Sequence, residues 1–133
     1  MLNVEHIGIA VKSLEKSIPL FEKLLNTTCY KTEMVQSENV NTAFFKKGET
    51  KIELLESTTE DGVIRKYIEK KGEGIHHLAF EVEDIFSEMN RLKNEGFIVL
   101  NDKPKNGADN KLVCFLHPKS TNSVLIELCQ EKK

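Results

Sequence analysis

Four residues stand out because their side chains and their spacing suit metal chemistry. His6 and Glu53 lie 47 residues apart in the first half of the chain. His77 and Glu127 lie 50 residues apart in the second half. Glu127 belongs to the apolar run Val124–Cys129, where a buried carboxylate is costly unless a proton, a cation or a metal compensates its charge. Imidazole nitrogens and carboxylate oxygens together suit a divalent first-row metal, so we predict one metal site made from these four residues.

Each of these residues has a plainer interpretation when it is taken alone. A histidine in a strand is often a hydrogen-bonded structural residue, and a glutamate in a strand usually points to solvent. The recurrence of the pair in both halves favours the metal. His76 adjoins His77, but only His77 matches His6 in the repeat described next. Ligand histidines must be neutral, so we expect acid to release the metal.

An internal repeat positions the four residues. The segment 6–11 matches 77–82 at an offset of 71 residues, and both alternate like strands. Ser13 and Asp84 follow these segments as predicted helix caps. The apolar stripes of the two predicted helices agree at the same offset: Leu14, Ile18 and Phe21 correspond to Ile85, Met89 and Leu92.

Short strands are expected after each helix. The alternation and the turn residues predict them at about 29–35, 40–46 and 51–56, and again at about 97–100, 111–116 and 123–129, with a helix around 63–68 between the halves. The predicted fold class is α+β, with two βαβββ modules whose strands curve around the metal site. The modules are about 1–57 and 74–133, joined by 58–73 in a single domain.

Composition excludes several classes of protein. The 133 residues carry a formal net charge of −2, which argues against a nucleic-acid surface. No apolar run is long enough to span a membrane and no signal peptide is evident, so a cytoplasmic protein is expected. The three cysteines lack CxxC spacing, and we interpret them as small buried residues in a reducing compartment.

The chain resembles the vicinal-oxygen-chelate superfamily over essentially its whole length. Residues 72–82, 117–120 and 124–128 resemble the corresponding segments of methylmalonyl-CoA epimerases. The His/Glu/His/Glu set is similar to the metal set of bacterial glyoxalase I. This resemblance implies one divalent metal, nickel or cobalt in the first place, with zinc or manganese as alternatives.

Departures from both patterns decide which reaction the sequence favours. Glu53 stands where the epimerase pattern has glutamine, and Thr42 stands where that pattern has a glutamate base. Ala10 stands where glyoxalase I has an arginine that anchors glutathione. The framework favours the epimerase and the reacting residues favour the glyoxalase. We predict glyoxalase I (lactoylglutathione lyase), which converts the methylglyoxal–glutathione hemithioacetal to S-lactoylglutathione, with methylmalonyl-CoA epimerase as a near-even alternative.

Both reactions remove a proton next to a carbonyl group and return one through an enediolate or enolate. We predict that Glu127 loosens from the metal and takes the proton, while Glu53 returns it or remains a ligand. The small-molecule substrate is a thioester or hemithioacetal, and a homodimer is expected. Residues in the last loops are predicted to meet its phosphate or carboxylate, with solvated loop residues as the alternative: Lys105, Asn106, Lys119 and Ser120.

Two other classes are less favoured. A non-catalytic module that binds small ligands would commonly lack the four metal residues. A ring-cleaving dioxygenase prefers iron with two histidines and one carboxylate, and Glu53 as a fourth ligand would occupy a position that oxygen needs.

Overall fold

The computed structural model describes Met1 and residues 3–132, which form two compact units. The N-terminal unit comprises His6–His76, and the C-terminal unit comprises Met1–Glu5 together with His77–Lys133. The boundary between the units therefore falls inside two strands, β1 (Asn3–Ala10) and β5 (Gly74–Glu81). Each unit is described by itself.

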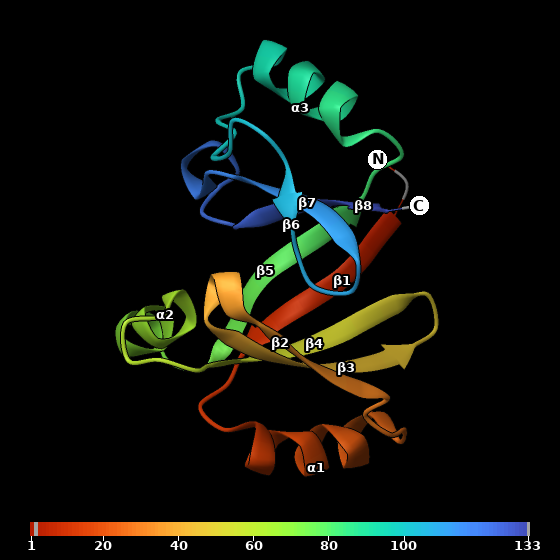
Figure 1. The fold of residues 1–133 in the computed structure, drawn as a ribbon, viewed down its shortest axis with the longest axis vertical. Coiled ribbons are helices and arrows are strands. Elements are labelled where there is room, and N and C mark those ends of the chain that lie inside the picture. The colour runs from red at the N-terminus through yellow and green to blue at the C-terminus, as the bar shows by residue number, and fades with distance from the viewer. Residues whose placement is uncertain (2, 133) are drawn as a thin grey trace. The chain divides into compact units, whose positions relative to one another are not determined.

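The N-terminal unit has four strands in the order β2-β3-β4-β1 (Figure 1). β1 runs parallel to β4, and β3 runs antiparallel to both β2 and β4. The remaining elements of this unit are α1 (Leu14–Leu25), β2 (Lys31–Val35), a 3-10 turn (Gln36–Glu38), β3 (Val40–Lys47), β4 (Thr50–Ser57) and α2 (Val63–Lys71).

The C-terminal unit repeats this plan with the strand order β5-β8-β7-β6. β5 runs parallel to β8, and β7 runs antiparallel to both β8 and β6. Its other elements are α3 (Ile85–Asn94), β6 (Lys105–Asn106), β7 (Lys111–Leu116), a 3-10 turn (Pro118–Ser120) and β8 (Ile126–Glu131). The α+β class and the two βαβββ modules are confirmed.

One predicted strand is wrong. In the described chain, residues 97–100 form no strand and make only an isolated bridge between Val99 and Leu116. The Leu100 N–H donates to the Phe115 carbonyl at 2.8 Å, so the segment follows β7 briefly before it turns away. Apolar side chains of this segment pack against the core under α3. That packing explains why residues 97–100 have the apolar pattern of a strand but do not form a full ladder of strand hydrogen bonds.

The two long helices begin as the sequence predicts. The Ser13 hydroxyl accepts a hydrogen bond from the Lys16 N–H at 3.3 Å, and the Asp84 carboxylate accepts one from the Ser87 N–H at 3.2 Å. Such side chains satisfy amide donors that the first helical turn leaves without partners. No helix within Met1 and residues 3–132 combines the length and the hydropathy needed to cross a membrane.

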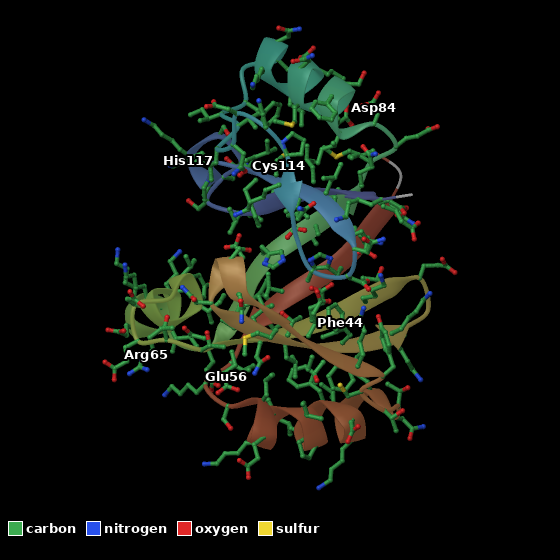
Figure 2. The ribbon with its side chains drawn as sticks, viewed as in Figure 1. Phe44, Glu56, Arg65, Asp84, Cys114 and His117 are labelled. Carbon is green, nitrogen blue, oxygen red and sulfur yellow. The ribbon has the colours of Figure 1, made fainter. Side chains whose placement is uncertain are left out.

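A second contact fixes each helix to the last strand of its unit. The Leu14 N–H donates to Oε1 of Glu56 at 3.0 Å, and Figure 2 labels Glu56 near the start of α1. The Ile85 N–H donates to Oε1 of Gln130 at 2.7 Å. The helix residues differ by 71 and the strand residues by 74. We call these two contacts the helix latches, and they show that the repeat extends to single hydrogen bonds.

Each unit buries one face of its strands under a long helix. In the N-terminal unit, Leu54 and Phe45 pack in the core beneath α1. In the C-terminal unit, Leu128 and Cys114 pack in the core beneath α3. Successive side chains of a strand point to opposite faces, so the residues between these core positions lie on the face away from the helix. We call this the site face of each unit.

Candidate metal centre

The first histidine–glutamate pair lies on the site face of the N-terminal unit. Nδ1 of His6 lies 3.2 Å from Oε2 of Glu53, and both side chains are buried, at 6% and 5% exposure. Gly8, two residues after His6, lies beside Glu53 in the parallel register of β1 and β4. A residue without a side chain at this place leaves room next to the carboxylate. Glu53 points away from α1 because its neighbour Leu54 packs beneath that helix.

The second pair has the same construction in the C-terminal unit. Nε2 of His77 lies 3.1 Å from Oε1 of Glu127, with side chains 6% and 8% exposed. Ala79, two residues after His77, lies beside Glu127 in the register of β5 and β8. The small residue next to the glutamate is therefore repeated. Glu127 points away from α3 because its neighbour Leu128 packs beneath that helix.

The geometry of both pairs fits adjacent ligands of one metal ion. Two ligand atoms that each lie about 2.1 Å from a metal, at a right angle to each other, are about 3.0 Å apart. The 3.2 Å between His6 and Glu53 and the 3.1 Å between His77 and Glu127 are close to that value. A cation would also compensate the buried carboxylates. Each pair alone supplies two ligands, fewer than the three or four protein ligands of ordinary zinc sites.

A phenylalanine lies directly across the ladder from each glutamate. Phe44 of β3 opposes Glu53, and Phe115 of β7 opposes Glu127. Phe44 is fully buried, and Figure 2 labels it in the N-terminal unit. The ring of Phe115 meets the ring of His77 edge-on, with 6.0 Å between centroids. These rings place apolar surface beside the polar pairs, where it excludes water and strengthens electrostatic interactions.

A lysine ammonium lies over each of these rings. Nζ of Lys31 is 4.7 Å from the centroid of Phe44, and Nζ of Lys105 is 5.8 Å from the centroid of Phe115. Lys105 was predicted from the sequence as a substrate contact, whereas Lys31 and the two phenylalanines were missed. Lys31, Phe44 and Phe115 could be identified only from the alignment of neighbouring strands, which the alternation along a single strand does not reveal.

The other predicted substrate contacts lie apart from this arrangement within the C-terminal unit. Asn106 is exposed, and its side-chain oxygen accepts from Nζ of Lys132 at 3.0 Å. Lys119 is exposed, and its backbone N–H donates to Nδ1 of His117. The Ser120 hydroxyl donates to the His117 carbonyl at 2.9 Å. The structure brings only Lys105 next to the phenylalanine that opposes Glu127.

Thr42 occupies the position where the epimerase pattern implies a glutamate base. It lies on β3 opposite Leu55, on the same face as Glu53, and is 1% exposed. Within the described part of the chain its hydroxyl oxygen has no hydrogen-bond partner. A threonine hydroxyl does not ionise near neutral pH, so it cannot take the place of a carboxylate as base.

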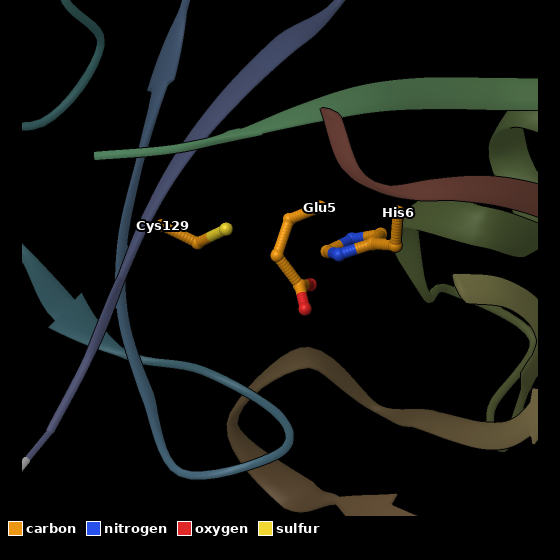
Figure 3. Close-up of side chains that lie close together, drawn as sticks. All are labelled: Glu5, His6 and Cys129. Atoms are coloured by element: carbon orange, nitrogen blue, oxygen red, sulfur yellow. The ribbon is translucent and has the colours of Figure 1, made fainter. Parts of the chain in front are cut away.

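The cysteines behave as buried core residues. Burial raises the pKa of the Cys114 thiol to about 11, and the nearby Glu127 carboxylate adds to the rise. Within the C-terminal unit, Sγ of Cys129 and a carboxylate oxygen of Glu5 lie within 4.8 Å of each other (Figure 3). The Cys129 thiol also donates to the Phe80 carbonyl at 3.5 Å. A carboxylate and a buried thiol alone do not complete a metal site.

Comparisons with known proteins cover most of the chain. A family model described as the glyoxalase/bleomycin resistance protein/dioxygenase superfamily matches residues 5–115. An ethylmalonyl-CoA/methylmalonyl-CoA epimerase of Cereibacter sphaeroides is 39% identical over 129 residues, which are 96% of each chain.

Two solved structures share the fold closely. A hypothetical protein of Bacillus halodurans is 42% identical, with a TM-score of 0.95 over 98% of this chain and 94% of that one. A variant of Streptomyces coelicolor methylmalonyl-CoA epimerase, in complex with 2-nitronate-propionyl-CoA, is 31% identical with a TM-score of 0.95. The match covers 100% of this chain and 99% of the epimerase.

Proposed function

Since this chain belongs to the glyoxalase/bleomycin resistance protein/dioxygenase superfamily, we propose that it is a metal-dependent epimerase of 2-carboxyacyl-CoA thioesters, with methylmalonyl-CoA as its substrate. The similarity to epimerases named for this reaction, at 39% and 31% identity over nearly the whole chain, supports the proposal. The sequence alone placed glyoxalase I first. The comparisons favour the epimerase alternative and give no specific support to glyoxalase I.

The observation that carries the proposal is the repeated histidine–glutamate pair. Each unit has one buried pair with about the same separation, 3.2 Å in one and 3.1 Å in the other. We propose that His6, Glu53, His77 and Glu127 together hold one divalent metal. Nickel or cobalt is the expected ion, with zinc or manganese as alternatives. When bound, such an ion acts as a Lewis acid that stabilises negative charge on the thioester oxygen.

The glutamates then carry the proton transfer. Epimerisation breaks the C–H bond at carbon 2, leaves its electron pair in an enolate, and forms a new C–H bond on the opposite face. The Glu127 carboxylate takes the proton, and Glu53, in its protonated form, returns one. Thr42 takes no part as a base. We propose that Glu53 instead performs the role of the glutamate that the epimerase pattern has at the position of Thr42.

The surroundings of the pairs support this chemistry. Phe44 and Phe115 oppose the two glutamates and keep water from them, so that the carboxylates retain their basicity. His6 and His77 remain ligands through neutral ring nitrogens. Lys105 is proposed to meet an anionic group of the substrate, because its ammonium lies over Phe115 and near the second pair. Asn106, Lys119 and Ser120 remain proposed contacts with the CoA moiety.

One assay tests the proposal. The purified protein is loaded in turn with nickel, cobalt, zinc or manganese. Each loaded form is then assayed with single epimers of methylmalonyl-CoA and, separately, with the methylglyoxal–glutathione hemithioacetal. We expect racemisation at carbon 2, with one solvent deuterium gained per inversion in D₂O. Turnover of the hemithioacetal alone would overturn the epimerase and restore glyoxalase I. Turnover of neither substrate with any of the four metals would favour a non-catalytic binding module.

A further inference from the structure

Lys31 lies in a cross-strand row that ends at a proposed metal ligand. In the register of β2 and β3, Lys31 opposes Phe44, and in the register of β3 and β4, Phe44 opposes Glu53. Residues that oppose each other in antiparallel strands share a face. Lys31 therefore belongs to the site face of the N-terminal unit, two strands from Glu53. Its ammonium lies over the Phe44 ring, 4.7 Å from the ring centroid.

The ammonium is held in place but remains accessible. Nζ of Lys31 lies 3.9 Å from Oε1 of Glu33, and the two side chains are 38% and 36% exposed. An ion pair exposed to this degree contributes little to folding stability. The aromatic ring below and the carboxylate beside it restrict where the lysine can point. A cation with this placement is suited to bind a ligand anion.

We propose that Lys31 binds the free carboxylate of the acyl group and makes the enzyme selective for 2-carboxyacyl-CoA thioesters. The inference rests on the proposed function and adds a specificity residue to it. The anion nearest the reacting carbon is the carboxylate that this carbon bears, whereas the CoA phosphates lie at the far end of the pantetheine arm. The row from Glu53 to Lys31 places the cation close to the reacting end. The cation also offsets the second negative charge that forms when carbon 2 loses its proton.

The C-terminal unit offers a related lysine for comparison. Lys105 lies over Phe115 at 5.8 Å, a longer distance than the 4.7 Å between Lys31 and Phe44. Lys105 opposes Val113 in the ladder, so it does not lie in the row of Glu127. The two lysines are therefore related but not equivalent. We assign the acyl carboxylate to Lys31 because only its row leads directly to the ligand glutamate.

The test separates binding from turnover. Isothermal titration calorimetry measures the Kd of methylmalonyl-CoA and of propionyl-CoA, which lacks the carboxylate, for the metal-loaded wild type and the Lys31→Gln variant. A hydrogen bond between charged groups corresponds to about a 10- to 150-fold change in affinity. We expect Lys31→Gln to weaken methylmalonyl-CoA by a factor in this range and to leave propionyl-CoA within about twofold. Lys31→Arg should recover part of the loss.

The matched control is Lys47→Gln, which removes an exposed lysine at the end of β3 outside the proposed machinery. It should change neither Kd, and thermal unfolding should show that both variants fold. Equal weakening of both ligands by Lys31→Gln would mean that the lysine meets the CoA moiety, and no weakening would mean that it binds neither anion. Either result overturns the inference. Failure of the wild type to turn over methylmalonyl-CoA would overturn the proposed function, while the Kd ratio would still decide the role of Lys31.

Discussion

Nε2 of His77 lies 3.1 Å from Oε1 of Glu127, whereas His76, the preceding residue, has its ring edge-on to Tyr67 with 4.8 Å between centroids. Adjacent residues of a strand point to opposite faces, so the two histidines have separate surroundings. We predict that His77→Ala lowers bound metal from the proposed one ion per chain to less than about a tenth of that, because it removes a proposed ligand. His76→Ala should keep its metal. Elemental analysis after dialysis measures both, and similar metal contents in the two variants would remove His77 from the site.

The proposed base can be tested apart from folding and metal binding. Glu127→Gln keeps the size and an oxygen of the side chain but cannot accept the proton. We expect the metal-loaded variant to lose about 10²- to 10⁴-fold in kcat, the usual contribution of general acid–base catalysis. The measurement is the exchange of the carbon-2 proton of methylmalonyl-CoA with solvent deuterium. Near-full exchange by a variant that binds metal normally would exclude Glu127 as the base.

We expect loss of a helix latch to lower the stability of the fold without changing the residues of the proposed metal site. Glu56→Ala leaves the Leu14 N–H without its acceptor and removes a negative charge from the start of α1. We expect the free energy of unfolding to fall by about 1–2 kcal/mol. Glu56→Gln should lose less than half as much, because Gln130 serves the other unit as a neutral acceptor. Urea titration measures both variants, and equal losses would show that the amide cannot replace the carboxylate here.

Alkaline pH should destabilise the fold through Cys114. Its pKa is raised in the folded protein to about 11, chiefly by burial, so the folded state holds the proton more tightly than the unfolded chain does. The contribution of the Cys114 thiol to the free energy of unfolding is therefore fully present below the ordinary thiol pKa of about 8.5–9. It is lost as the pH rises toward 11. We expect the urea midpoint to fall over this window, and to fall less in Cys114→Ala. An identical pH dependence in the variant would assign the loss to other groups.

The repeat makes the two histidine–glutamate pairs predictable because it is a property of the sequence itself. The offset of 71 selected His77 over His76, and the same offset located both helix caps, Ser13 and Asp84. Phe44 and Lys31 were beyond such reasoning, because their relation to Glu53 depends on how three strands are aligned. An apolar pattern also could not distinguish a paired strand from residues that pack under α3, as residues 97–100 do.

The comparisons favour the second-ranked reaction, the epimerase, for a different reason. In the sequence, Glu53 and Thr42 favour glyoxalase chemistry, whereas the segments around His77, His117 and Glu127 resemble the epimerases. Proton transfer needs carboxylates within reach of the reacting carbon, and strand order can supply one from β4 as well as from β3. The residue type at a single position therefore agrees less well with the comparisons than the similarity of these longer segments does.

The last strand of each unit holds its proposed metal ligand and its latch residue three residues apart: Glu53 and Glu56 in β4, Glu127 and Gln130 in β8. An odd spacing sends the two side chains to opposite faces, so one strand presents a proposed metal ligand on one side and holds the helix with the other. A single-residue deletion that precedes both residues in either strand would turn the metal-facing glutamate toward the helix and the latch residue toward the site face together. Length variation in this protein should thus be confined to the connecting loops, and the three-residue difference between the offsets, 74 against 71, is length that such loops can absorb.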